Sequence, residues 1–173
     1  MYTRPIRRIS YYRVMSMKKP VITFILSILL AEAVGALSGF LTRDGMELFS
    51  TAVTQPPLTP PPVVFPIVWS ILYGLMGFGS ARIWLSEPSP ERSRALNLYA
   101  VQLGVNFFWS LIFFNAQAYG FAFFWLILLW VLVLLMILAF DKVDPLSAKL
   151  QVPYLIWLTF AAYLNLGVWY LNR

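Results

Sequence analysis

The chain has 173 residues, of which 60% are hydrophobic and 12% are charged, with a net charge of +6. A soluble domain averages roughly 45–50% apolar and about 25% charged residues. The composition therefore excludes an ordinary soluble domain, a disordered chain and, despite the positive charge, a nucleic-acid-binding arm. The chain contains no cysteine and no histidine, which excludes disulfides, thiolate metal sites and histidine ligation of a metal or haem. These counts predict a helical membrane protein with no metal site and no cofactor.

A basic segment precedes the first apolar stretch. Residues 1–19 carry six of the thirteen lysines and arginines, and we predict that this segment is poorly ordered. Two interpretations stay open. The segment binds anionic lipid at the membrane surface, or the chain starts at Met15 or Met17 and the extension is dispensable.

Five stretches are long enough to cross a bilayer, which takes roughly 20 mainly apolar residues in a helix. They cover residues 21–41, 63–85, 96–115, 119–140 and 150–171. The stretches lack the alternation of apolar and polar residues that is typical of membrane β-barrel strands. The sequence therefore predicts an all-α membrane protein, in which residues 20–173 form one domain built as a five-transmembrane-helix bundle.

The basic residues also predict an orientation. Eleven of the thirteen lie before the first span, at the end of the second span or in the connections after the second and fourth spans. The positive-inside rule then places the N-terminus in the cytoplasm and the C-terminus on the opposite side. It leaves open which membrane holds the protein.

The first span contains one acidic residue and a pair of glycines. Glu32 is the only acid within a predicted span, and a carboxylate at that depth is protonated, paired or in contact with water. Arg82 and Arg173 are candidate partners. Gly35 and Gly39 form a Gly-x-x-x-Gly face, which permits close helix contact either within the bundle or in a homodimer.

The connection between the first two spans is long and rich in proline. It covers residues 42–62, and six prolines fall between Pro56 and Pro66. Proline fixes the backbone angle φ and cannot continue a helix interior, so we predict a stiff, extended connector. It is either a plain linker or a lid over one mouth of the bundle, and its length favours the lid.

Polar and aromatic residues recur at helical spacing inside the spans. An amide in hydrocarbon needs a partner, so the side chains of Gln102, Asn106 and Asn165 should face the bundle interior. Helical spacing places aromatic residues on the same faces, which predicts one cavity for a large planar aromatic or fused-ring ligand. Its candidate residues are Trp69, Tyr73, Asn106, Trp109, Trp157 and Asn165. The alternatives are polar contacts that only join the helices, and an aromatic belt at the membrane interface.

Three segments together resemble the translocator protein family, also called TspO/MBR or tryptophan-rich sensory proteins. The first is Pro60–Gly77, which reads Pro-Pro-Pro-Val-Val-Phe-Pro-Ile-Val-Trp-Ser-Ile-Leu-Tyr-Gly-Leu-Met-Gly. The second is Asn106-Phe107-Phe108-Trp109, and the third is Asp144–Lys149 followed by Pro153–Trp157. The resemblance covers about residues 19–172 and implies a five-helix bundle whose pocket opens beneath the 42–62 loop.

The resemblance also implies a ligand and a set of site residues. Family members bind porphyrins such as protoporphyrin IX and related hydrophobic planar molecules, and some degrade porphyrin in light with two tryptophans. Those tryptophans correspond here to Trp69 and Trp157. The pocket positions correspond to Tyr73, Asn106, Trp109, Phe121, Ala161 and Leu164.

Several functions follow as hypotheses. The first is a membrane receptor or carrier for porphyrins with a stress-regulatory role. The alternatives are a light-dependent porphyrin-degrading enzyme that uses Trp69 and Trp157, a small-molecule transporter, and a structural scaffold that binds no ligand. The chain departs from the family pattern at Val63 and Phe49, where tryptophans are expected, and these changes affect the predicted lid.

Overall fold

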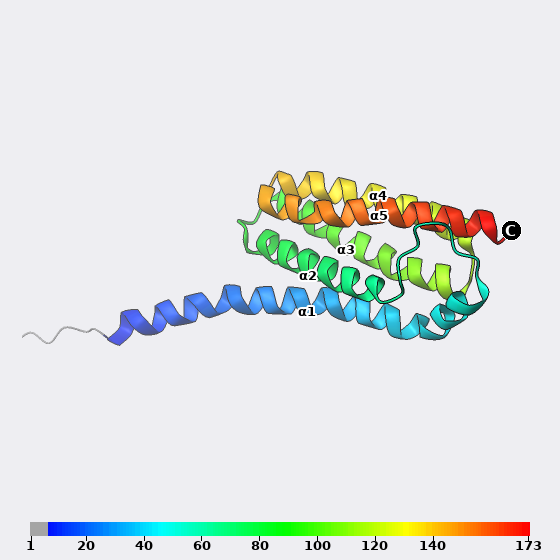
Figure 1. The fold of residues 1–173 in the computed structure, drawn as a ribbon. Helices are drawn as coiled ribbons and strands as arrows, with labels where there is room; N and C mark the ends of the chain where they lie inside the picture. Colours follow the sequence, from blue (N-terminus) through cyan, green and yellow to red (C-terminus); the bar gives the residue numbers. More distant parts are fainter. Residues whose placement is uncertain (1–6) are drawn as a thin grey trace, which may run out of the picture.

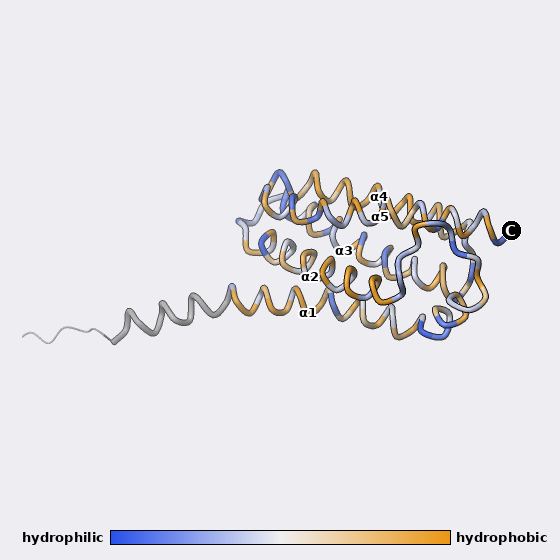
Figure 2. Tube along the Cα trace, in the orientation of Figure 1, coloured by the Kyte–Doolittle hydropathy of each residue, from blue (hydrophilic) through white to orange (hydrophobic). Residues whose placement is uncertain are grey.

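The computed structural model describes the backbone of residues 7–173 and the side chains from residue 20 onward. Its helices are, in chain order, α1 (Arg7–Ala52), α2 (Val64–Leu85), α3 (Pro90–Ser110), the π-helix η1 (Leu111–Asn115), α4 (Tyr119–Asp141) and α5 (Pro145–Leu171). Because η1 continues α3, these helices form five stretches long and apolar enough to cross a membrane. The predicted all-α, five-helix bundle is thus confirmed. Figure 1 shows the helices lying side by side, and Figure 2 shows apolar residues along all of them.

The connections lie at two ends of the bundle. The α2–α3 and α4–α5 connections lie at the end from which α1 projects, whereas residues 53–63, the η1–α4 connection and the C-terminus lie at the other (Figure 1). We call the latter the loop end. The prediction for residues 1–19 stays a prediction, since residues 1–6 and the side chains of residues 7–19 lie outside the described part.

Polar N-cap residues followed by proline mark the first turns of α3 and α5. The side chain of Ser89 accepts a hydrogen bond from the Arg92 backbone N–H (3.1 Å), and proline follows in the first turn. Asp144 caps α5 in the same way, accepting from the Ser147 N–H at 3.1 Å. A polar N-cap followed by proline is typical of helix starts because it satisfies a free backbone donor and presets φ.

The first helix is longer than its hydrophobic stretch. The structure continues α1 to Ala52, so the connector is residues 53–63 and not 42–62 as predicted. The charged residues Arg43, Asp44 and Glu47 end the apolar run, but a helix outside hydrocarbon accommodates them readily. The first proline after them is Pro56, where a helix cannot continue. The end of the span and the end of the helix therefore fall at different residues.

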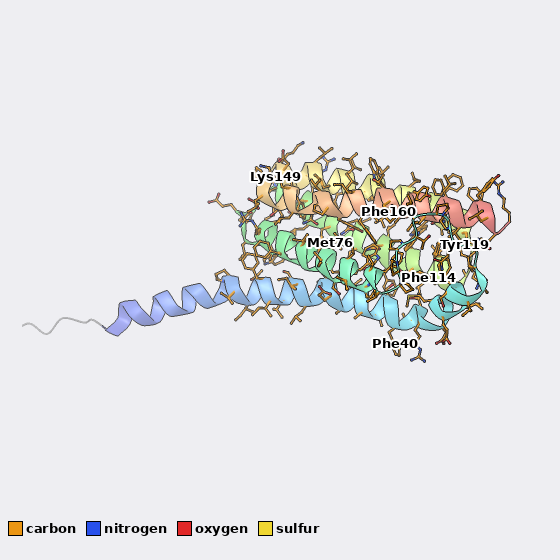
Figure 3. All side chains as sticks on the ribbon, viewed as in Figure 1. Phe40, Met76, Phe114, Tyr119, Lys149 and Phe160 are labelled. Atoms are coloured by element: carbon orange, nitrogen blue, oxygen red, sulfur yellow. The ribbon has the colours of Figure 1, made fainter. Side chains whose placement is uncertain are left out.

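The half of the bundle away from the loop end is a packed core. Its largest fully buried side chains include Met76, Phe140 and Tyr154. The Tyr154 hydroxyl donates to the Gln102 side-chain oxygen at 3.1 Å, and the Gln102 amide lies 3.7 Å from the Met76 sulfur. Gln102 is thus partnered inside the bundle, as a buried amide requires. Figure 3 shows the side chains that fill the space between the helices.

An ion pair closes this half of the bundle. Arg82, in the last turn of α2, donates to both carboxylate oxygens of Asp144, at 2.7 and 3.0 Å. Asp144 also accepts hydrogen bonds from Ser147. The pair joins α2 to the start of α5 over sixty-two residues of sequence. It excludes Arg82 as the partner of Glu32, and Arg173 lies instead over the Tyr170 ring at 4.5 Å.

Candidate ligand-binding site

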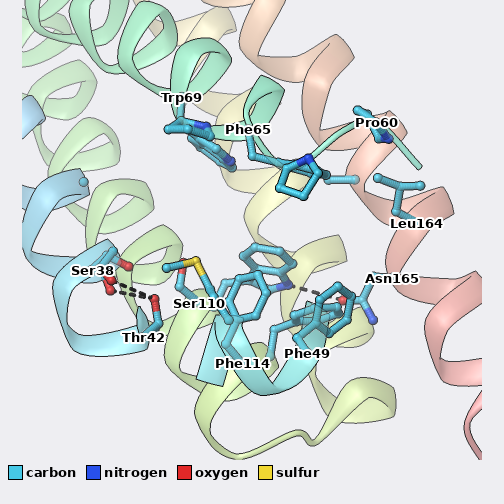
Figure 4. A pocket seen from close by; sticks show the side chains of 18 of the residues that line it. Ser38, Thr42, Phe49, Pro60, Phe65, Trp69, Ser110, Phe114, Leu164 and Asn165 are labelled. Carbon is cyan, nitrogen blue, oxygen red and sulfur yellow. Dashed lines mark hydrogen bonds between the residues drawn. The ribbon is translucent and has the colours of Figure 1, made fainter. Parts of the chain in front are cut away.

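A cavity of about 560 Å³ lies at the loop end of the bundle. Its walls come from the second half of α1, the first half of α2, the junction of α3 with η1, the second half of α5 and the 53–63 loop. Figure 4 shows Trp69 and Phe65 on one side of the cavity and Phe49 and Phe114 on the other. The volume falls in the range of roughly 300–1,000 Å³ that is typical of small-molecule sites.

Hydrogen bonds fix the polar residues in the wall. The Asn106 amide donates to the Tyr73 hydroxyl at 3.2 Å, which joins α3 to α2. The Trp109 indole N–H donates to the Asn165 side-chain oxygen at 3.3 Å, and the Asn165 amide donates to the Tyr119 carbonyl at 2.8 Å. These bonds hold the rings in fixed positions, so the cavity presents preset aromatic surfaces to a ligand.

The aromatic rings form contacts around the cavity. Trp109 stacks on Phe113 with ring centroids 5.1 Å apart. Trp69 lies 5.6 Å from the Tyr73 ring, and Trp157 lies 6.0 Å from Phe65. Such pairs stabilise the wall by about 0.5–1.5 kcal/mol each beyond the area they bury.

The structure brings together eight of the nine predicted ligand-binding residues. Those that line the cavity are Trp69, Tyr73, Asn106, Trp109, Trp157, Ala161, Leu164 and Asn165. Phe121 does not line it. Its side chain is 58% exposed and its ring packs beside Trp125 at 5.8 Å, because it lies on the outer face of α4, a helix that contributes nothing to the cavity wall.

Sequence reasoning missed the part of the wall that α1 and η1 provide. Ser38, Thr42, Met46 and Phe49 line the cavity from α1, and their spacing by three or four residues is that of one helix face. This spacing was the available signal, but residues 42–62 were predicted as a connector. The Phe49 ring lies 5.4 Å from Phe113 of η1.

The two glycines of the Gly-x-x-x-Gly pair in α1 have different surroundings. A Cβ at Gly35 would lie 2.3 Å from the Tyr73 ring, whereas one at Gly39 would meet nothing within 4 Å. Gly35 therefore serves close contact within the bundle, between α1 and α2. Gly39 leaves open space beside the cavity that it lines.

The 53–63 loop is fastened to the C-terminal part of α5. The Thr54 N–H donates to the Asn172 side-chain oxygen, and the Asn172 amide donates back to the Thr54 carbonyl, both at 2.9 Å. The Tyr163 hydroxyl donates to the Pro57 carbonyl at 2.9 Å. Pro56, Thr59 and Pro60 of this loop line the cavity. The loop thus covers part of the site and is held by side chains rather than by regular backbone pairing.

We expect Asn172→Ala to loosen this loop without unfolding the bundle. The change removes the acceptor of the Thr54 amide, so that amide should exchange with solvent about 10-fold faster, since solvent-exposed hydrogen bonds contribute about 0.5–1.5 kcal/mol each. Hydrogen exchange of residues 53–63 measures the effect directly. The control is Asn97→Ala at an exposed position of α3. Equal exchange in both variants would contradict a fastening role for Asn172.

Comparison with known proteins shows which family this chain belongs to. The sequence model of the TspO/MBR family matches residues 27–171. The chain belongs to the TspO/MBR family. It is 35% identical over 160 residues to the tryptophan-rich protein TspO of Chlorobaculum tepidum, covering 90% of this chain and 99% of that one. It is also 37% identical over 136 residues to the translocator protein of Ovis aries, covering 78% and 80% of the two chains.

A third relative supports the same assignment. Protein CrtK of Rhodobacter capsulatus is 38% identical over 122 residues, covering 70% of this chain and 76% of that protein. The TspO/MBR membership and the five apolar helices make this chain an integral multi-pass membrane protein.

Proposed function

We propose that this TspO/MBR protein is a membrane receptor or carrier for porphyrins such as protoporphyrin IX and related hydrophobic planar molecules, with a stress-regulatory role. The observation that carries the proposal is the aromatic cavity of about 560 Å³, which Trp69 and Trp157 both line. The resemblance to porphyrin-binding family members and relatives named translocator and tryptophan-rich proteins agree with it.

The cavity wall suits a flat macrocycle. Tryptophan and tyrosine rings offer planar apolar faces, and burying a few hundred Å² of a ligand stabilises the complex by several kcal/mol at about 25 cal/mol per Å², before the cost of ordering. The chain has no histidine and no cysteine, which are common axial ligands of haem iron. Methionine and tyrosine, which the chain does contain, are the other common axial ligands. We therefore expect metal-free porphyrin to bind at least as well as haem.

Replacing either wall tryptophan with phenylalanine should weaken porphyrin binding. Trp69→Phe and Trp157→Phe each remove part of the stacking surface, and we expect about a 5-fold rise in Kd, which corresponds to about 1 kcal/mol. Titration of the detergent-solubilised protein with protoporphyrin IX in the dark, followed by the porphyrin absorbance, measures Kd.

The matched control is Trp84→Phe, which changes an exposed tryptophan outside the cavity. Porphyrin binding by this variant should equal that of the unchanged chain. Failure of protoporphyrin IX to saturate the unchanged chain would refute the proposed function. Equal Kd values in all three variants would show that the porphyrin binds outside the cavity.

A second candidate function is light-dependent porphyrin oxidation. The observation that favours it is that both tryptophans implicated by the family resemblance, Trp69 and Trp157, line the same cavity. Illuminating the titrated sample tests it. A new porphyrin product that forms with the unchanged chain and not with a Trp69→Phe/Trp157→Phe variant would establish an enzyme, and an unchanged spectrum would leave a receptor or carrier.

We also propose that the loop end, with the cavity, faces away from the cytoplasm. Eleven of the thirteen basic residues belong to the other side, as the positive-inside rule requires. Cysteine introduced at exposed Thr51 or at exposed Lys142 should react with a membrane-impermeant thiol reagent from opposite sides of the membrane. Labelling of Lys142→Cys from outside intact cells would show that the orientation is the opposite of the one proposed.

A further inference from the structure

Among the residues whose side chains the structure describes, one charged residue lines the cavity, and it is Glu32. Its Oε1 lies beside Gly74 of α2, 3.7 Å from the position that a Cβ there would occupy. Arg82 is bound to Asp144 and Arg173 lies over Tyr170. Among the described residues, no hydrogen bond or ion pair reaches the Glu32 carboxylate. It is an acid in the wall of a binding site without a protein partner.

Glu32 lies at the seam between α1 and α2. Ala36 of α1 and Pro66 and Ser70 of α2 also line the cavity there, and all three are exposed. Gly39 adds open space next to them. The wall along this seam is therefore made of small side chains, and the carboxylate is accessible to a molecule in the cavity.

The rest of the wall, as far as the structure describes it, carries no formal charge. Apart from Glu32, it consists of aromatic, aliphatic, methionine, glycine, proline, hydroxyl and amide residues. Tyr73 is the other titratable residue among them, and its hydroxyl already accepts a hydrogen bond from Asn106. A carboxylate in such surroundings is costly unless a cation or donor pairs with it. A ligand can supply that partner.

We propose that Glu32 is a specificity residue, which makes this cavity prefer planar aromatic ligands that carry a protonated amine over ligands that carry a carboxylate. An ammonium group would form a short, charge-assisted hydrogen bond with Glu32. A carboxylate at the same place would meet like charge. The inference rests on the proposed function, and it implies that protoporphyrin IX, which carries two carboxylates, binds with both of them away from Glu32.

A series of three porphyrins with one macrocycle tests the inference. The probes are protoporphyrin IX, with two carboxylates, its neutral dimethyl ester, and its bis(2-aminoethyl) amide, with two ammonium groups at neutral pH. Each is titrated into full-length protein in a neutral detergent. The measured quantity is the ratio of the Kd of each charged probe to that of the ester. Comparing these ratios between variants cancels the partitioning of each probe into detergent.

We expect Glu32→Gln to remove the preference for the cation. The ratio of the Kd of the amine probe to that of the ester should rise about 10-fold, the size typical of a lost charge-assisted hydrogen bond. The ratio for the diacid should fall, because the repulsion is gone. Glu32→Asp, which keeps a carboxylate, should retain the preference. The control Glu47→Gln removes the same charge from an exposed position of α1 outside the cavity and should leave both ratios unchanged.

The outcomes separate the two proposals. Ratios that are the same in Glu32→Gln and the unchanged chain would overturn the role of Glu32 and leave porphyrin binding intact. An equal change in Glu47→Gln would also overturn it, since the effect would then be a general effect of charge. Failure of all three probes to bind saturably would refute the proposed function and this inference with it. If Glu32→Gln does not fold, loss of the preference in the folded Glu32→Asp variant would count against the inference.

Discussion

Gly77→Ala is expected to force α1 away from α2 and to lower the free energy of unfolding by about 3 kcal/mol. A Cβ at Gly77 would lie 2.5 Å from the Ile28 Cα and 2.7 Å from the Ser27 carbonyl oxygen. Both are backbone atoms, so no side-chain rotation relieves the clash. The helices can accommodate the methyl group only by moving apart.

The effect should reach the ligand site because the same helix, α1, forms part of the cavity wall. From residue 20 onward, the buried residues of α1 are small: Ala31, Ser38 and Thr42. Moving α1 outward displaces the wall that carries Glu32 and Ser38, so porphyrin binding should weaken together with stability. Unfolding of the purified protein by an ionic detergent measures stability, and the dark titration measures binding.

Gly104→Ala is the matched control for this prediction. A Cβ at Gly104 would meet nothing within 4 Å, and alanine is the better helix former by about 1 kcal/mol. This variant should be as stable as the unchanged chain or slightly more so. Equal stability of the Gly77 and Gly104 variants would show that α1 and α2 are not in contact at this point in solution.

Most of the fold was predictable because a run of apolar residues indicates each membrane-spanning helix. The bilayer accepts only such runs, so hydropathy located all five helices. The aromatic cavity was predictable for a different reason. Amides and tryptophans at helical spacing need an interior to face, and Asn106, Trp109 and Asn165 share one. The family resemblance identified Ala161 and Leu164, which are small or aliphatic and carry no chemical signal of their own.

The failures have physical causes at particular residues. Hydropathy ended the first span near Leu41, but a helix does not stop where hydrocarbon stops, and α1 continues to Ala52. The π-helix η1 was not predicted either. Its extra residue per turn is seen in the hydrogen bond from the Ala116 N–H to the Leu111 carbonyl at 3.0 Å. No residue type specifies such a turn, which depends on packing against neighbours.

The same limit applies to long-range pairs. Arg82 lies in the last turn of α2 and Asp144 in the connection before α5, and only the folded chain shows that they meet. Asp144 was recognisable as part of the family segment, but its partner was not. Glu32 is unusual as the one acid within a predicted span, but the partners suggested for it are occupied elsewhere.

Asp144→Asn should lower the free energy of unfolding by about 2 kcal/mol, the middle of the range for hydrogen bonds to charged groups. Asparagine remains a good N-cap for α5, so the variant removes the charge and leaves the cap. The side chains of Arg82 and Asp144 are 33% and 18% exposed. Their pairing is therefore shielded from water better than that of a surface pair, and an unpartnered Arg82 would remain between α2 and α5.

The dependence on pH identifies the ion pair as the cause. The Arg82 guanidinium and the Ser147 donors hold the pKa of the Asp144 carboxyl well below its usual range. The unfolded carboxyl has a pKa of about 3.9, so the stabilisation is fully present above about pH 4. It is lost as the pH falls further toward the folded pKa, because protonation then becomes more favourable in the unfolded chain. The stability difference between the unchanged chain and Asp144→Asn should shrink accordingly.

Asp44→Asn is the control, since it removes the same charge from the Arg43–Asp44 pair at 3.1 Å, whose side chains are 64% and 89% exposed. Such a pair contributes about 0–1 kcal/mol, so this variant should match the unchanged chain. A difference for Asp144→Asn that stays constant from pH 7 to below pH 3 would assign the loss to the changed hydrogen-bonding groups of the side chain and not to its charge. The connection between α2 and α5 would then not depend on the ion pair.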